Sequence, residues 1–178
     1  MFRLWQMGQE RSVAQMSFSD RWQKPRAVIV DMDGTLVNVS SIRHYVRNIP
    51  SDEEEVKKRE KDFDSFHKAS VLCPAIWETV DKVQWYWEAR MDVLVVTARN
   101  RNYEKTTRDW LHKYAIPYNK LFMRDVGDYR PDVDVKRDIL AEIEETWRVV
   151  HAIDDNPNVI ALWEEKGIPV TLVPGWED

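Results

Sequence analysis

Two acidic residues, Asp31 and Asp33, follow a wholly apolar run in the segment Asp31-Met32-Asp33-Gly34-Thr35-Leu36. A carboxylate that is buried without a partner is costly, so two acids at this place need compensation. A divalent cation can supply it, because hard cations such as Mg²⁺ bind oxygen ligands, typically one or two carboxylates with water and substrate phosphate. Gly34 permits a tight turn after them. The spacing therefore predicts a magnesium site at the end of a buried strand.

Further polar side chains stand at the ends of other predicted elements. The hydroxyl and guanidinium groups in Thr97-Ala98-Arg99 suit phosphate oxygens, which arginine can bind bidentately. Lys136 stands where a helix is expected to begin, which is unfavourable for a cation in the helix dipole, and a nearby anion would explain it. Asp154 and Asp155 end another apolar run. Together these residues predict a phosphate-binding site that combines carboxylates with cations.

Apolar periodicity predicts the elements that position these residues. Short apolar runs, most of them rich in β-branched residues, predict strands at 27–30, 93–96, 120–123, 149–153 and 170–173. Helical spacing predicts three helices, whose apolar stripes are Ile76, Trp77, Val80, Val83 and Trp87; Trp110, Leu111 and Tyr114; and Val135, Ile139, Leu140, Ile143 and Trp147. A last helix opens at Asn156-Pro157 and stops at Gly167. Alternating strands and helices predict an α/β fold, a Rossmann-like, mainly parallel sheet with helices on both faces, which binds ligands at the carboxyl ends of its strands.

The predicted organisation is an N-terminal tail at 1–26 and one domain at 27–178, which the length of 178 residues suits. The first two strands are separated by about 60 residues, far more than a usual connection. Part of this stretch, at about 38–74, is interpreted as a small cap or flap over the strand ends, the alternative being a surface elaboration without function. Within it, the run 52–61 alternates acids and bases and predicts a solvated helix. His67, in the same insertion, is a candidate phosphate donor.

Composition excludes several classes of protein. The 26 Lys and Arg against 31 Asp and Glu give a net charge of −5, which argues against a broad basic clamp on duplex nucleic acid but permits recognition of one strand end. No apolar run approaches the roughly 20 residues that span a bilayer, and no secretory signal is expected. The single cysteine, Cys73, excludes a disulfide framework and predicts a reducing, cytoplasmic location. Cys73 itself is expected to be a buried apolar residue.

In this order, the motifs resemble those of the haloacid dehalogenase superfamily of phosphotransferases: Asp31 to Leu36, Thr97, Lys136, and Asp154-Asp155. Three segments, 95–99, 127–136 and 152–155, resemble more closely the phosphatase domain of bacteriophage polynucleotide kinase-phosphatases. The resemblance covers the chain from about Ala27 to its end. It implies removal of 3′-phosphates from DNA or RNA ends. The kinase domain of that family, with its phosphate loop, has no counterpart here, so a separate kinase or ligase is an expected partner.

The resemblance also implies the catalytic roles. Asp31 is the expected nucleophile, which forms an aspartyl-phosphate. Asp33 is expected to protonate the leaving ribose oxygen and then to activate the hydrolytic water. Mg²⁺ is expected to bind Asp31, Asp155 and the carbonyl oxygen of Asp33, with Asp154 bridging or supporting them.

The phosphate is assigned to a second group of residues. Thr97 and Lys136 are expected to hold phosphoryl oxygens, and Arg99 and Arg130 to bind the phosphate or the adjoining backbone. Asp132 either orients one of these arginines or is a turn residue. The remaining substrate-binding assignments are Gly34, Thr35 and Ala98. The family's arginine after the first motif corresponds in spacing to Ile42, with Arg43 one residue later.

Three functions compete. The first is a Mg²⁺-dependent polynucleotide 3′-phosphatase. The second is a 5′(3′)-nucleotidase acting on free nucleoside monophosphates, because Ile153-Asp154-Asp155 is similar to a strand end in the deoxyribonucleotidases of the superfamily. The third is a catalytically silent module that binds strand ends, against which the four intact motifs argue.

Overall fold

A computed structural model describes residues 24–46 and 62–174. Its centre is a sheet of five strands in the order β3-β2-β1-β4-β5. The strands are β1 (Arg26–Val30), β2 (Asp92–Asn100), β3 (Lys120–Arg124), β4 (Arg148–Asp154) and β5 (Val170–Leu172). Every neighbouring pair is parallel, which confirms the α/β fold and all five predicted strands. Most of the predicted tail and the charged run 52–61 lie outside the described residues.

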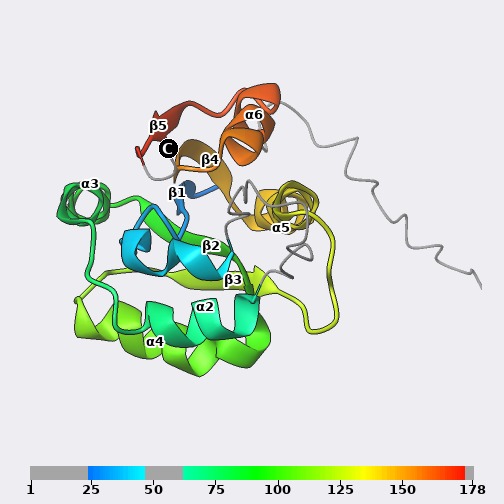
Figure 1. The fold of residues 1–178 in the computed structure, drawn as a ribbon. Helices are drawn as coiled ribbons and strands as arrows, with labels where there is room; N and C mark the ends of the chain where they lie inside the picture. Colours follow the sequence, from blue (N-terminus) through cyan, green and yellow to red (C-terminus); the bar gives the residue numbers. More distant parts are fainter. Residues whose placement is uncertain (1–23, 47–61, 175–178) are drawn as a thin grey trace, which may run out of the picture.

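Helices cover both faces of this sheet (Figure 1). They are α2 (Phe63–Ser70), α3 (Trp77–Glu88), α4 (Glu104–Lys113), α5 (Asp132–Thr146) and α6 (Pro157–Glu165), with the short 3₁₀ helices η2 (Ser40–Tyr45) and η3 (Arg101–Tyr103). Successive side chains of β1 point to opposite faces, as strand geometry requires. Val28 and Val30 therefore pack with residues of α2, α3 and α4, whereas Ala27 and Ile29 pack with α5 and α6.

Two predicted helices differ in detail from the observed ones. The apolar side chains of α3 that are buried in the core are Val80 and Val83, and the partly buried Tyr86 packs against that core. Trp77 and Trp87, at its ends, are 57% and 40% exposed, so the prediction that they belong to the apolar stripe is wrong. The helix expected to begin near Val135 begins at Asp132, because Pro131 presets the backbone before it and acids occupy its first turn.

The two ends of the 38–74 segment meet directly after β1. The Asn38 backbone N–H donates to Pro74 at 2.9 Å, and Val37 forms an antiparallel bridge with Ala75. The Trp110 indole N–H on α4 donates to the carbonyl of Cys73 at 3.0 Å. Cys73 is buried, as the sequence predicted. The segment is thus fastened at its base next to the Asp31–Leu36 loop.

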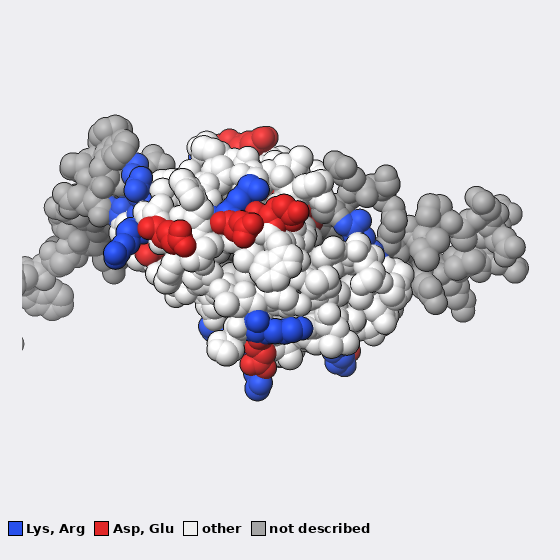
Figure 2. Space-filling model, turned by 90° about the vertical axis from the view of Figure 1, so that its left-hand side faces the viewer, with Lys and Arg blue, Asp and Glu red and all other residues white. Residues whose placement is uncertain are grey.

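The outer surface carries mixed charge where it can be seen. Over the face that includes α3, acidic and basic side chains lie among uncharged ones, and several basic side chains gather at the left edge of the view (Figure 2). Within residues 24–46 and 62–174, no helix combines the length and the apolar character needed to cross a membrane.

Candidate active site

The loop after β1 lies at the centre of the sheet, where β1 is flanked by β2 and β4. The connection after β1 runs toward β2, whereas the connection after the neighbouring β4 runs toward β5 on the opposite side. Parallel α/β sheets bind ligands where two such connections diverge. The Asp31 N–H extends the ladder by donating to Ile153 at 3.0 Å. The carbonyl of Met32 then accepts from Leu36 and Val37, at 2.9 and 2.8 Å, and closes a compact turn. This turn presents the first motif at the carboxyl edge of the sheet.

Three buried carboxylates from β1 and β4 converge at this edge. Asp31, Asp154 and Asp155 can each place one oxygen within 4.8 Å of the others. The Asp154-Asp155 pair ends β4, next to β1, so the parallel register of the two strands brings them to Asp31. Carboxylate oxygens at this separation are typical ligands of a hard divalent cation.

Lys136 is the cation that the sequence placed beside an anion. Its Nζ donates to Asp31 Oδ1 at 2.7 Å and to Asp154 Oδ2 at 2.8 Å, and its side chain is only 3% exposed. The two carboxylates outweigh burial and raise the pKa of Lys136, so the side chain remains an ammonium. Because α5 begins at Asp132, Lys136 lies in its second turn, and these carboxylates, rather than the helix dipole, determine its surroundings.

Asp154 and Asp155 have different surroundings. Asp154 is fully buried, and its oxygens accept from Lys136, from the Trp163 indole N–H at 3.2 Å and from the Asn156 backbone N–H at 3.1 Å. Asp155 Oδ1 accepts from the Thr35 hydroxyl at 2.7 Å. Its Oδ2 is buried without a hydrogen-bond partner among the residues that the structure describes. Asp155 therefore has an oxygen free for a metal ion.

Gly34 makes room for this carboxylate. A Cβ atom at position 34 would lie 2.0 Å from Asp155 Oδ2, and the φ of +95° also favours glycine. Burial, together with the neighbouring Asp154, raises the pKa of Asp155 to about 7. Burial and the two neighbouring carboxylates likewise raise the pKa of Asp31, against the attraction of Lys136. Three carboxylates around one ammonium leave an excess of negative charge, so the donor set and the orphaned oxygen fit a divalent cation.

Asp33 lies apart from this cluster and is paired with Arg99. The guanidinium donates to both carboxylate oxygens, at 2.6 and 2.5 Å, and its remaining nitrogen reaches the Thr107 hydroxyl at 3.3 Å. Arg99 is only 1% exposed. Burial raises the pKa of Asp33, but the charge and hydrogen bonds of Arg99 outweigh it and lower that pKa. Arg99 thus keeps Asp33 ionised and fixes the orientation of its carboxylate.

The β3–α5 loop holds the other predicted residues in an arrangement that the sequence did not predict. Asp132 pairs with Arg124 at 2.5 Å, and not with Arg99 or Arg130. Arg124 also donates to Ala98, Asp128 and Arg130 carbonyl oxygens, which ties this loop to β2. Arg130 is about half exposed and pairs with Asp128 and Asp138, so its guanidinium engages carboxylates of its own loop and of α5.

The fold therefore brings together most of the predicted residues. The contacts described above join five of them: Asp31, Lys136, Asp154, Asp155 and Thr35. A separate ion pair joins Asp33 to Arg99. Thr97 is buried on β2, where its hydroxyl accepts from the Arg99 backbone N–H at 3.2 Å, and Ala98 is half-buried beside it. Ile42, at the spacing of the family arginine, is buried on η2, with Arg43 next to it.

Three residues that support the site were not identified from the sequence: Trp163, Thr107 and Arg124. Their side chains bind Asp154, Arg99 and Asp132, respectively. Only Arg124 carried a local signal, as a cation at the tip of a predicted strand. The other two lie on helices, where their types are also typical of core packing.

The topology and this site define a phosphatase of the haloacid dehalogenase class. Within that class, the chain belongs to the family described as the polynucleotide kinase PNKP phosphatase domain, which its residues 25–175 match. Both expectations drawn from the motifs are thereby confirmed.

Relatives extend this assignment. A putative bifunctional polynucleotide kinase/RNA ligase of Autographa californica nuclear polyhedrosis virus is 26% identical over 151 residues, which are 83% of this chain and 19% of that protein. A chain in a structure of the Pnkp1/Rnl/Hen1 complex is 25% identical, with a TM-score of 0.68, and the match covers 85% of this chain and 46% of that one. A haloacid dehalogenase-like hydrolase from Streptococcus pneumoniae shares the fold, with 15% identity, a TM-score of 0.58 and coverage of 83% of this chain and 84% of that one. The chain thus spans less than half of the first two relatives.

Proposed function

We propose that the chain is a Mg²⁺-dependent polynucleotide 3′-phosphatase that acts through an aspartyl-phosphate. One observation carries the proposal: a buried oxygen of Asp155, which has no hydrogen-bond partner within residues 24–46 and 62–174, lies against Gly34 in the same carboxylate cluster as Asp31, in a chain of the PNKP phosphatase family. The Asp31 and Asp155 side chains and the Asp33 carbonyl oxygen are the proposed ligands. When bound, Mg²⁺ offsets the negative charge of the phosphate and lets it approach a carboxylate.

In the first step, a carboxylate oxygen of Asp31 attacks the phosphorus, and the bond to the ribose 3′-oxygen breaks. Lys136 Nζ, at 2.7 Å from Asp31 Oδ1, orients the nucleophile. The same ammonium stabilises the charge that develops on the phosphoryl oxygens. Asp154 fixes Lys136 from the other side and is in turn fixed by Trp163. Thr97, buried at the adjacent strand end, is the proposed hydroxyl donor to a phosphoryl oxygen.

Asp33 moves the protons. Its pKa is lowered by Arg99, so it is ionised in the free protein. The first step needs a proton on Asp33 for the leaving oxygen. A phosphate monoester that binds as its monoanion can bring this proton, since its second pKa is about 6. In the second step, the carboxylate form takes a proton from the water that hydrolyses the aspartyl-phosphate. Arg99 holds the carboxylate in place for both transfers.

Arg99 is thereby proposed to act on the substrate through Asp33, because its donors already bind Asp33 and Thr107. Arg130 is the exposed cation that can exchange its carboxylate partners for the phosphate backbone of a strand. The 38–74 segment, fastened next to the first motif, is proposed to be a cap. The viral relative, of which this chain covers 19%, is named as a putative bifunctional polynucleotide kinase/RNA ligase, so we also propose that a kinase or ligase acts alongside this chain.

The test is phosphate release with Mg²⁺ from three substrates: an oligonucleotide with a 3′-phosphate, the same oligonucleotide with a 5′-phosphate, and mixed nucleoside 3′- and 5′-monophosphates. Asp31→Asn is the control, because the amide has nearly the same shape and is a poor nucleophile. We expect the 3′-phosphate oligonucleotide to be preferred, and the variant to be folded and inactive. Preference for the free monophosphates would make the protein a nucleotidase instead. Activity in Asp31→Asn would overturn the assignment of the nucleophile.

A further inference from the structure

Three aromatic side chains from α2 and η3 lie in contact at the surface. The His67 ring stacks on Phe63, with 6.2 Å between centroids and an angle of 29°, and its centroid also lies 4.9 Å from that of the Tyr103 ring. Phe63 is 51% exposed, and the other two are half-buried. We call Phe63, His67 and Tyr103 the aromatic ledge.

The ledge is anchored on both sides. Phe66, which is buried in the core, contacts the His67 ring edge-on at 5.5 Å. The Tyr103 hydroxyl donates to the Asp64 carboxylate, which joins η3 to α2. Tyr103 follows β2 directly, so the ledge is continuous with the strand that carries Thr97 and Arg99. Its geometry is therefore tied to the site.

The ledge also lies beside the reacting groups. The charged groups that act on His67 are Asp33 and Arg99 of the site, and Asp132 and Arg124 of the β3–α5 loop. All four come from the carboxyl ends of β1, β2 and β3 or from the segments that follow them. The ledge therefore lies at the same edge of the sheet as Asp33, the group proposed to transfer the proton.

His67 contributes an uncharged ring. Burial lowers its pKa to about 4, and the two carboxylates and two guanidinium groups around it act in opposite directions. Its Nδ1 is buried without a hydrogen-bond partner in the described part of the chain. At neutral pH the ring is therefore not the phosphate-binding cation that its type alone suggests. Its surroundings favour an aromatic contact.

We propose that the aromatic ledge stacks against the nucleobase of the terminal nucleotide, and thereby selects strand ends over small phosphate esters. This inference rests on the proposed function. A net charge of −5 argues against a broad basic face that would hold a strand, so we expect uncharged contacts to contribute to its affinity. Every base has a π-face, so stacking holds a strand end whatever its sequence.

The test compares the full chain with Phe63→Ala on three substrates under Mg²⁺. They are a 3′-phosphate oligonucleotide with a terminal thymine, the same oligonucleotide with an abasic terminal residue, and p-nitrophenyl phosphate. For the thymine substrate we expect kcat/KM to fall by about 5- to 150-fold, from roughly 1–3 kcal/mol per stacked base at 1.4 kcal/mol per tenfold. For the other two substrates we expect changes below about twofold, because stacking on a base adds nothing to them.

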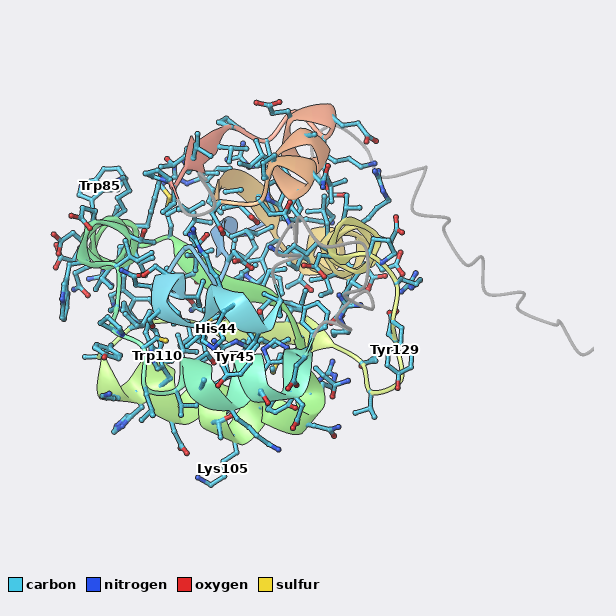
Figure 3. The ribbon with its side chains drawn as sticks, in the orientation of Figure 1. His44, Tyr45, Trp85, Lys105, Trp110 and Tyr129 are labelled. Atoms are coloured by element: carbon cyan, nitrogen blue, oxygen red, sulfur yellow. The ribbon has the colours of Figure 1, made fainter. Side chains whose placement is uncertain are left out.

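Two variants serve as controls. Phe63→Trp keeps a stacking surface and should retain the preference for the thymine substrate. Trp85→Ala removes an aromatic side chain of similar exposure, 60%, from α3. Trp85 projects outward on the opposite side of the molecule from Tyr129 of the β3–α5 loop (Figure 3), so this variant should change none of the three rates. Because Phe63 is half exposed, its replacement leaves the core intact, and circular dichroism checks the fold of each variant.

The outcomes separate the two proposals. An unchanged rate for Phe63→Ala on the thymine substrate, or an equal loss on all three substrates, would overturn the proposed base stacking. Neither result would contradict the proposed phosphatase activity. A wild-type protein that hydrolyses p-nitrophenyl phosphate but neither oligonucleotide would overturn the proposed substrate class, and the ledge with it.

Discussion

Replacing Lys136 by Met removes the ammonium between Asp31 and Asp154 and keeps a side chain of similar length. In the wild-type protein this ammonium makes contacts of 2.7 and 2.8 Å and is almost completely buried. Removing one partner of a buried ion pair costs roughly 3–5 kcal/mol, because the other partner stays buried without its counter-charge. For a domain of this size, each kcal/mol shifts the melting temperature by about 2–4 °C, so we expect a fall of roughly 6–20 °C.

Two further results follow from the same geometry. Lys136 acts against the rise in the pKa of Asp31, so in the variant that pKa rises further above its value in the unfolded chain. Because the folded pKa of this carboxyl group is raised, its protonation stabilises the folded protein at low pH. That contribution is lost as pH rises through the folded pKa. The loss of stability of Lys136→Met relative to the wild type should therefore be larger at pH 8 than at pH 5. Mg²⁺ should restore part of it, because a cation replaces the missing charge.

The assay is thermal unfolding at both pH values, with and without Mg²⁺, together with kcat for phosphate release. We expect kcat to fall by about 10²–10³-fold, the usual loss when one donor to a developing anion is removed. Lys105→Met is the matched control, because Lys105 pairs with Asp109 on the exposed side of α4 (Figure 3) and should contribute less than about 1 kcal/mol. A Lys136→Met protein as stable and as active as the wild type would refute the placement of this ammonium between two carboxylates.

Three other substitutions test separate parts of the site. Gly34→Ala places a Cβ atom 2.0 Å from Asp155 Oδ2, so it should abolish the rise in melting temperature that Mg²⁺ produces. Gly127→Ala is the control, because a Cβ atom there has nothing within 4 Å; it should only lower the free energy of unfolding by about 1–2 kcal/mol through its positive φ. Asp155→Asn removes the unpartnered buried charge, so in EDTA at pH 8 it should melt no lower than the wild type, yet gain nothing from Mg²⁺; an undiminished Mg²⁺ response would exclude Asp155 as a ligand. His67→Phe concerns acid stability: the pKa of His67 is lowered to about 4, so the unfolded chain binds more protons between pH 6.5 and 4 and the wild type loses stability as pH falls through this range. The variant should lose less than the wild type in urea unfolding at pH 4.5, and an identical loss would contradict the burial of a neutral imidazole.

The sequence by itself determined the sheet and the chemical identity of the site. Strands β1 and β2 are apolar on both faces because helices cover the sheet on both sides, so their residues form continuous runs that stand out in the sequence. Polar residues directly after such runs have to lie at the carboxyl edge of a parallel sheet. The type and order of Asp31, Thr97, Lys136 and Asp154-Asp155 were therefore enough to predict a phosphate site and its class.

Only the tertiary structure decided how these residues are paired. Asp154 and Asp155 are adjacent in sequence and equivalent in type, yet one is saturated by Lys136 and Trp163 while the other keeps an oxygen free. Arg99 had the appearance of a phosphate ligand, but the fold places Asp33 against it from 66 residues away. These distinctions depend on distances between strands and helices that no local pattern encodes.

The ends of helices and the aromatic residues were the least predictable features for the same reason. Trp77 and Trp87 have the spacing of the apolar stripe of α3, but in the fold only Val80 and Val83 of that predicted stripe are buried and both tryptophans are exposed. Phe63 and His67 precede β2 in the sequence, Tyr103 follows it, and the three meet because α2 contacts η3. Local sequence determines which residues are apolar or charged and how often they recur, whereas the packing of distant elements decides which of them are buried, which are paired, and which remain free to bind a ligand.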